Sequence, residues 1–150
     1  GASVGVMGAV ADGVLEKGGE VIGVIPFALA TREVAHDGLN ELIVVDSMHE
    51  RKAKMAELSD GFIALPGGWG TLEEIFEMLT WAQLGFHDKP CGLLNTDGYF
   101  DHLLAYLDNA NTEGFLRTEN REMLLCDADP AGLIRQFERY TAPHVEKWTT

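Results

Sequence analysis

The sequence is short of basic residues, has only two cysteines, and contains no apolar run long enough to span a membrane. Its 24 acidic side chains outnumber the 11 basic ones and give a net charge of −13. Most of such a surface would repel DNA or RNA, whereas a small phosphorylated ligand needs only a local positive site. The lack of a membrane segment or a signal peptide favours a cytoplasmic location.

The cysteines and histidines do not form a metal-binding pattern. Cys91 and Cys126 lie in separate apolar runs without CxxC spacing, so we expect free, buried thiols. The five histidines include no i,i+4 pair and no HExxH motif, and a metal site is therefore not expected.

Short apolar runs alternate with longer helical patterns along the chain. Strands are predicted at 21–25, 42–45, 62–65, 92–94 and 124–126, and helices at 5–18, 47–59, 70–85, 98–113 and 130–140. This alternation is typical of an α/β fold of three layers, Rossmann-like, with a parallel sheet flanked by helices. The length of 150 residues and the 46% apolar content suit a single domain, 1–150, with 141–150 as a tail.

The segment FIALPGGWGTLEE, residues 62–74, has the pattern of a buried strand, a glycine-rich turn and the start of a helix. Gly67 and Gly68 allow the backbone to approach a ligand closely. The helix that Gly70 and Thr71 open offers free N–H groups and its positive dipole end to an anion. The segment therefore predicts a phosphate-binding turn.

Two residues of this segment admit both a chemical and a structural interpretation. Glu74 follows Thr71 by three positions, which is the spacing of a capping box, in which the glutamate bonds back to the cap. The glycine-rich turn favours a chemical role for Glu74, because capping alone does not require such a turn. Trp69 could stack on a purine or simply cover the turn.

A second candidate segment, SMHERKAKM at 47–55, is predicted to be a helix capped by Ser47, with Glu50 completing a capping box. Arg51 falls near the positive end of the helix dipole, where a cation is unfavourable. Helical spacing also places it on one stripe with the two methionines of the segment rather than out in water. An arginine there needs an anionic partner, either a ligand or a structural ion pair.

The motifs MHERK and PGGWGTLEE together closely resemble the LONELY GUY (LOG) family, whose members were once described as lysine decarboxylases. The resemblance covers nearly the whole chain. It implies a phosphoribohydrolase that cleaves the N-glycosidic bond of cytokinin riboside 5′-monophosphates to free base and ribose 5-phosphate, without a cofactor, and it leaves AMP open as a substrate. It also implies a further βα unit of about 30 residues before the point where this sequence starts.

The same resemblance implies that Arg51 and Glu74 are catalytic. The residues that it implies for substrate binding are Glu33, Arg51, Lys52, Gly67, Gly68, Trp69, Gly70, Thr71, Leu72, Glu73, Glu74 and Thr80. On the sequence alone, Glu33 is an ordinary loop carboxylate, and Thr80 could equally bond back to a carbonyl of its own helix.

LOG proteins are homodimers with the site near the subunit interface, and the resemblance implies the same here. The segment EMLTWAQLGF, which contains Met78, Trp81 and Phe86, is apolar enough to cover both a core and a partner subunit. The alternative is that it covers the core alone.

Three other protein classes fit less well. The molybdenum-cofactor carrier proteins resemble this fold and hold a phosphorylated ligand without cleaving it, but the presence of both Arg51 and Glu74 favours the enzyme. A pyridoxal-phosphate decarboxylase needs a Schiff-base lysine and a ring-nitrogen partner, and neither is recognisable. A dinucleotide oxidoreductase needs GxGxxG spacing, which GASVGVMG lacks.

Overall fold

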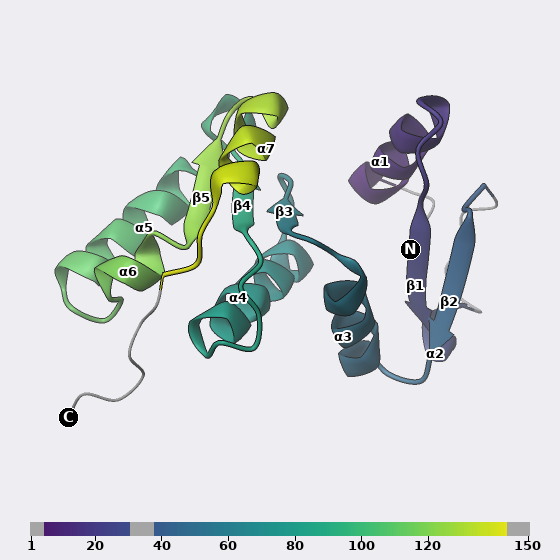
Figure 1. The fold of residues 1–150 in the computed structure, drawn as a ribbon, viewed down its shortest axis with the longest axis horizontal. Coiled ribbons are helices and arrows are strands. Elements are labelled where there is room, and N and C mark those ends of the chain that lie inside the picture. The colour runs from purple at the N-terminus through teal and green to yellow at the C-terminus, as the bar shows by residue number, and fades with distance from the viewer. Residues whose placement is uncertain (1–4, 31–37, 144–150) are drawn as a thin grey trace. The chain divides into compact units, whose positions relative to one another are not determined.

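The computed structural model describes residues 5–30 and 38–143, and the chain divides into two compact units, Gly1–Ser59 and Asp60–Thr150. Each unit contains its own parallel sheet flanked by helices (Figure 1). The α/β class and the parallel pairing predicted from the sequence are confirmed, in the manner of a Rossmann-like fold. The strands pair within each unit rather than across one continuous sheet.

The first unit is built on a two-stranded sheet. Its elements are α1 (Gly5–Glu16), β1 (Ile22–Pro26), α2 (Phe27–Ala30), β2 (Glu41–Val45) and α3 (Met48–Leu58). The strands β1 and β2 are parallel, with Ile22 opposite Glu41 and Pro26 opposite Val45. Helix α3 packs against both strands, and the β1 residue Ile25 is 1% exposed.

The second unit is built on a three-stranded parallel sheet in the order β3-β4-β5. Its elements are β3 (Phe62–Ala64), α4 (Trp69–Gln83), β4 (Cys91–Leu94), the 3₁₀ helix η1 (Thr96–Gly98), α5 (Asp101–Thr112), α6 (Thr118–Arg121), β5 (Leu124–Asp127) and α7 (Pro130–Arg139). Each strand is followed by a helical connection, which parallel neighbours require.

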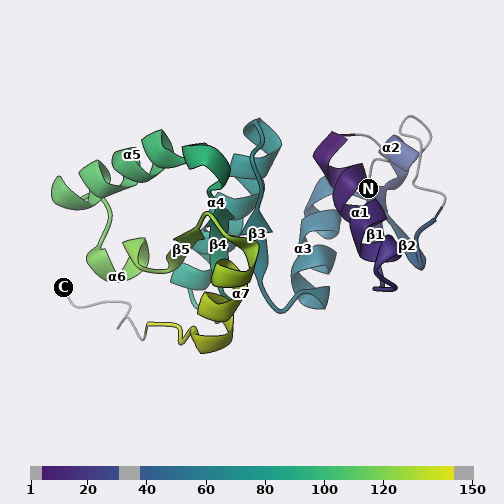
Figure 2. The same cartoon turned by 90° about the horizontal axis from the view of Figure 1, so that it is seen from above.

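Helices cover both faces of this second sheet. Helix α4 packs on β3 and β4, and α7 packs on β4 and β5. A Cβ at Gly92 would meet the side chains of Phe137 and Leu133, so Gly92 faces α7. Cys91 and Leu93 point to the other face, because side chains alternate along a strand, and they are 1% and 0% exposed. Figure 2 shows α5 and α7 on opposite sides of the sheet, so the second unit has three layers.

Two helix caps predicted from the sequence are confirmed. The Glu50 N–H donates to the Ser47 hydroxyl oxygen at 3.1 Å, as predicted, whereas the Glu50 carboxylate accepts the N–H of Asp46, the residue before the cap, at 2.8 Å. At the start of α7, the Asp129 carboxylate accepts the Gly132 N–H at 2.8 Å. Each cap satisfies N–H groups that the first turn of a helix leaves without a partner.

Some predicted boundaries were wrong. The helix expected over 98–113 begins only at Asp101, because Asp97 and Gly98 adopt positive φ angles of 52° and 72°, which interrupt a helix. The helices α2 and α6 were not predicted, since four residues are too few to show a periodic pattern. Both cysteines are free as expected, but Cys126 is only half-buried.

Other expectations fall partly or wholly outside the described residues. Of the predicted tail, only 141–143 is described, and it follows α7 without regular secondary structure. The number of domains and the preceding βα unit stay predictions. Among the helices of 5–30 and 38–143, none is long and apolar enough to cross a membrane.

Candidate functional site

The glycine-rich turn joins β3 to α4, as the sequence predicted. Gly68 is the N-cap of α4, and the first bond of the helix runs from the Leu72 N–H to the Gly68 carbonyl oxygen at 3.2 Å. The N–H groups of Trp69, Gly70 and Thr71 precede that bond, and helix geometry gives them no carbonyl partner inside the helix. This arrangement offers several donors and the positive end of a 15-residue helix to an anion.

The glycines of the turn serve different steric needs. A Cβ added at Gly67 would overlap the Thr71 hydroxyl, so the turn can pass there only without a side chain. At Gly68 and Gly70, a Cβ would meet no described atom within 4 Å. These two positions therefore leave open space above the first turn of α4, which a ligand could fill.

A contact from outside the motif, which was not predicted from the sequence, holds the turn. The Tyr99 hydroxyl donates to the Gly67 carbonyl oxygen at 2.9 Å, across 32 positions of the chain. The contact is possible because β3 and β4 are parallel neighbours, so the segments that follow them lie at the same edge of the sheet. The predicted parallel sheet was the one signal in the sequence that could have indicated this contact, since Tyr99 follows the predicted strand at 92–94.

The segment that carries Tyr99 is itself tied down. The Asn95 side-chain oxygen accepts the Phe100 N–H at 2.7 Å, and the Asn95 amide donates to Asp101 at 2.7 Å. The backbone N–H of Asn95 donates to the Asp127 carbonyl at 2.8 Å. Phe100 is 2% exposed, and its ring meets the Tyr99 ring edge to face, with the centroids 5.0 Å apart.

Glu74 lies in the second turn of α4, and the capping-box interpretation of it is wrong. The helix begins at Trp69 with Gly68 as its cap, so Thr71 is already the third helical residue. Glu74 is half-buried beside the buried stripe of Ile75 and Met78, whereas the neighbouring Glu73 is exposed. Glu74 thus lies at the border between the packed and the exposed face of α4, in the turn that follows the proposed anion site.

Arg51 and Lys52 lie in the first turns of α3, in the first unit. The buried face of this helix is formed by Lys52, which is 8% exposed, together with Ala56 one turn later. Arg51 is half-buried. The predicted apolar stripe is only partly correct, because Met48 and Met55 are 42% and 36% exposed.

The predicted site residues therefore fall into three groups. The second unit brings Gly67, Gly68, Trp69, Gly70, Thr71, Leu72, Glu73 and Glu74 together on one turn and the first turns of α4, whereas Thr80 lies near the other end of that helix. Arg51 and Lys52 are adjacent on α3 of the first unit. Glu33 lies outside the described residues.

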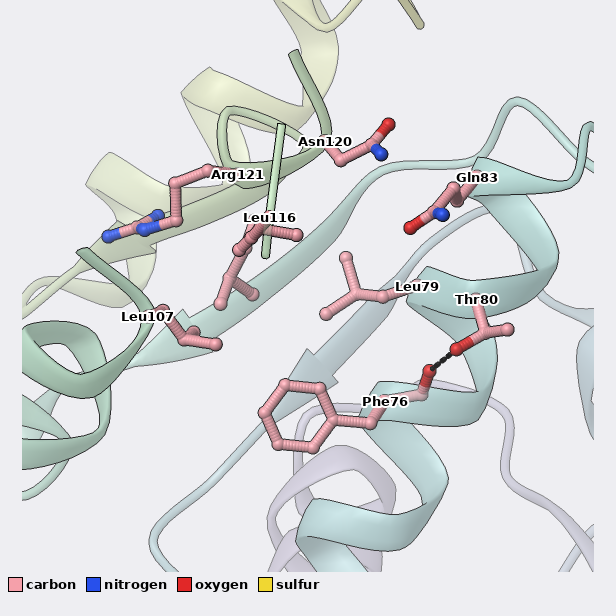
Figure 3. Close-up of a pocket in the computed structure, with 9 residues that line it drawn as sticks. Phe76, Leu79, Thr80, Gln83, Leu107, Leu116, Asn120 and Arg121 are labelled. Atoms are coloured by element: carbon pink, nitrogen blue, oxygen red, sulfur yellow. Dashed lines mark hydrogen bonds between the residues drawn. The ribbon is translucent and has the colours of Figure 1, made fainter. Parts of the chain in front are cut away.

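Thr80 lies at a pocket between α4, α5, α6 and β5. The pocket has a volume of about 190 Å³ and is lined by Phe76, Leu79, Thr80, Gln83, Leu107, Leu116, Asn120, Arg121 and Leu124. The Thr80 hydroxyl donates to the Phe76 carbonyl oxygen of its own helix at 2.7 Å (Figure 3). Thr80 thus makes the bond back to its own helix that the sequence left open as an alternative to substrate binding. Arg121 is ion-paired to Asp108 at 2.8 Å.

Burial shifts the pKa of His87, Cys91, Cys126 and Tyr140 in the second unit. Burial lowers the pKa of His87 below its ordinary value of 6.5. The His87 Nδ1 accepts the Lys89 N–H at 3.1 Å, so the Nε2, 3.0 Å from the Met78 carbonyl oxygen, carries the proton. Burial also raises the pKa of the Cys91 thiol to about 12.

Comparison with known proteins confirms the family resemblance. A family model described as "Possible lysine decarboxylase" matches residues 7–137. The chain is 51% identical over 146 residues to the probable cytokinin riboside 5′-monophosphate phosphoribohydrolase LOGL1 of Oryza sativa subsp. japonica, covering 97% of this chain and 66% of that protein.

Relatives from Arabidopsis thaliana bear the same enzyme name and match over a similar length. The chain is 49% identical over 144 residues to the cytokinin riboside 5′-monophosphate phosphoribohydrolase LOG4 of Arabidopsis thaliana, covering 96% of this chain and 67% of that protein. It is 47% identical over 144 residues to LOG1 of the same plant, covering 68% of that protein. The chain thus spans about two thirds of the length of the curated relatives that it matches.

Proposed function

This chain belongs to the family of the cytokinin riboside 5′-monophosphate phosphoribohydrolases, and we propose that it hydrolyses the N-glycosidic bond of nucleoside 5′-monophosphates of that kind. The observation that carries the proposal is the geometry of α4. Its N-terminus is an open glycine-rich turn, and the half-buried Glu74 follows five residues after Trp69. Those five residues correspond to about 7.5 Å along the helix axis.

The 5′-phosphate is assigned to the turn. The N–H groups of residues 68–71 would donate to its oxygens, and the helix dipole would favour its charge. Arg51 and Lys52, on α3 of the first unit, are retained as the proposed positive side chains of the site. In this arrangement the phosphate acts as a handle, whose binding energy places the reacting C1′ against Glu74.

The chemical step is assigned to Glu74. As the bond between C1′ and the base nitrogen breaks, its electron pair leaves with the base, and positive charge develops on C1′ and the ring oxygen. A nearby carboxylate stabilises that charge or accepts a proton from the attacking water. The water oxygen bonds to C1′, and the base nitrogen is protonated, which gives ribose 5-phosphate and free base.

The other predicted site residues complete the proposal. Arg51 is assigned to neutralising or orienting the ribose and the carboxylate, as the second catalytic residue. Trp69 is 89% exposed beside the turn, so its ring is accessible to stack on the purine. Glu33, Leu72, Glu73 and Thr80 are retained as substrate-binding residues.

The test is release of base from AMP, from isopentenyladenosine monophosphate and from the unphosphorylated riboside. We expect release from the monophosphates only, and the relative rates rank the bases. Glu74→Gln should lower kcat by roughly 10²- to 10⁴-fold, whereas Glu113→Gln, at the exposed end of α5, should retain the wild-type rate. Near-full turnover by Glu74→Gln would contradict the role of Glu74 in the chemical step. Binding of the monophosphates by the wild type without release of base would indicate a carrier protein instead.

We further propose that the protein is a cytoplasmic homodimer with its site near the interface. The apolar segment at 77–86 supports the dimer. Within it, Met78 is 5% exposed, whereas Phe86 is 73% exposed and Leu84 is 43% exposed. The segment therefore has apolar surface beyond what the core uses. Sedimentation should give a dimer that Phe86→Glu weakens, and a wild-type monomer would contradict the proposal.

A further inference from the structure

The hydrogen bond between Tyr99 and Gly67 controls the direction of a neighbouring donor. The peptide group that joins Gly67 to Gly68 is planar, and the described residues contain no cis peptide bond. In a trans peptide group the C=O and the N–H point in opposite directions. When the Gly67 carbonyl is held toward the Tyr99 hydroxyl, the Gly68 N–H must therefore point to the other side of the turn.

The backbone at Gly68 is accessible. Gly68 is exposed, and a Cβ built there would meet no atom within 4 Å among the residues that the structure describes. The Gly68 N–H belongs to the same set of donors as the first N–H groups of α4. Without the bond to Tyr99, the peptide group between two glycines could rotate at little steric cost, since glycine tolerates most backbone angles.

Tyr99 is well placed to hold this peptide group. Its segment is fixed by the bonds of Asn95 to Phe100, Asp101 and Asp127, and its ring rests against the buried ring of Phe100. The hydroxyl is thus carried by a backbone segment that is fixed at the edge of the sheet, and the Tyr99 side chain itself is 54% exposed. A donor fixed in advance binds an anion more tightly than one that must first be ordered.

We propose that Tyr99 is a positioning residue, which holds the Gly67 carbonyl and so aims the Gly68 N–H at the 5′-phosphate of the substrate. This inference rests on the proposed function and assigns the phosphate-binding geometry of that same site to a residue outside the glycine-rich motif. Tyr99 does not touch the reacting atoms. Its effect is expected in phosphate affinity and not in the chemical step.

The test compares Tyr99→Phe with Tyr106→Phe, a matched control on α5 whose ring is 66% exposed. Loss of one ordered hydrogen bond should raise the KM for AMP and the Kd for ribose 5-phosphate by roughly 3- to 10-fold. The kcat should stay within about twofold of wild type, and the weak binding of adenosine should not change. The Tyr106→Phe protein should match wild type in all four quantities.

A readout without ligand tests the same step. In the unliganded protein, Tyr99→Phe should shift the Gly68 amide resonance, because the peptide group is no longer held in one orientation, and Tyr106→Phe should leave that resonance unchanged. An unchanged Gly68 amide resonance, or equal losses of ribose 5-phosphate and adenosine binding, would overturn the role of Tyr99. If the wild-type protein bound neither AMP nor ribose 5-phosphate, the proposed function would fail as well, so the two failures are distinguishable.

Discussion

Gly67 and Thr71 lie so close together that the Thr71 hydroxyl occupies the space of a Cβ on Gly67. Gly67→Ala should therefore lower the free energy of unfolding by about 1–3 kcal/mol, since the added methyl group forces the turn or the first turn of α4 to move. Urea denaturation followed by circular dichroism measures this change. Gly70→Ala, which meets no described atom within 4 Å, should change stability by less than about 1 kcal/mol.

The same contact can be tested by a double-mutant cycle. Thr71→Ala removes the hydroxyl that the new methyl group would overlap, so the pair Gly67→Ala and Thr71→Ala should be less destabilising than the sum of the two single changes. A coupling of about 0.5–3 kcal/mol is expected for residues in direct contact. Strict additivity would show that the two side chains do not compete for one space.

The cap of α3 gives a second stability prediction. Ser47→Ala removes the acceptor of the Glu50 N–H and should cost about 1 kcal/mol of unfolding free energy. At the other end of the helix, the Ser59 hydroxyl donates back to the Met55 carbonyl, and Ser59→Ala should cost less than about 0.5 kcal/mol. Equal losses in the two variants would contradict the assignment of Ser47 as the cap.

His87 should make stability depend on pH. Its pKa is lowered in the folded protein, so below pH 6.5 the unfolded chain takes up a proton that the folded chain does not. The free energy of unfolding should therefore fall as the pH drops below about 6.5, and no such loss is expected from this group above that pH. Urea denaturation between pH 7.5 and 5.5 measures the slope.

Variants separate His87 from the other histidines. His87→Gln should be less stable at pH 7.5, because the bonds to Lys89 and Met78 change, but its stability should vary less between pH 7.5 and 5.5. His102→Gln, at an exposed position of α5, should keep the wild-type slope. An unchanged slope in His87→Gln would exclude His87 as the source.

Trp69 should report ligand binding without supporting the fold. Its side chain is 89% exposed, so Trp69→Phe should alter the unfolding free energy by less than about 0.5 kcal/mol. Addition of AMP to wild type should change the tryptophan fluorescence through stacking, and this signal should be lost in Trp69→Phe. A full signal in the variant would place the base elsewhere.

Local patterns were sufficient to predict the alternation of strands and helices, the caps at Ser47 and Asp129 and the turn that opens α4. Each of these is encoded within a few neighbouring residues. Whether Thr71 caps the helix could not be decided from such a local pattern. The answer depends on where the chain turns, and the structure places that turn at Gly68, three residues earlier.

The contact between Tyr99 and Gly67 could not be predicted from local pattern, because it depends on the pairing of β3 with β4. The break at Asp97 was missed for a similar reason. A positive φ at a residue other than glycine is uncommon, and here it occurs where neighbouring bonds fix the segment. The proposed roles of Arg51 and Glu74 stay predictions, because the two residues belong to different units.

The burial of Cys91 in β4 has a consequence for how the second unit can be followed in solution. A thiol with a pKa of about 12 carries almost no thiolate at neutral pH, and thiolate is the form that alkylating reagents attack. Modification of Cys91 therefore has to wait until β4 leaves the sheet. The alkylation rate of Cys91 therefore measures how often β4 opens, and β4 is the strand that pairs with β3, which leads into the glycine-rich turn.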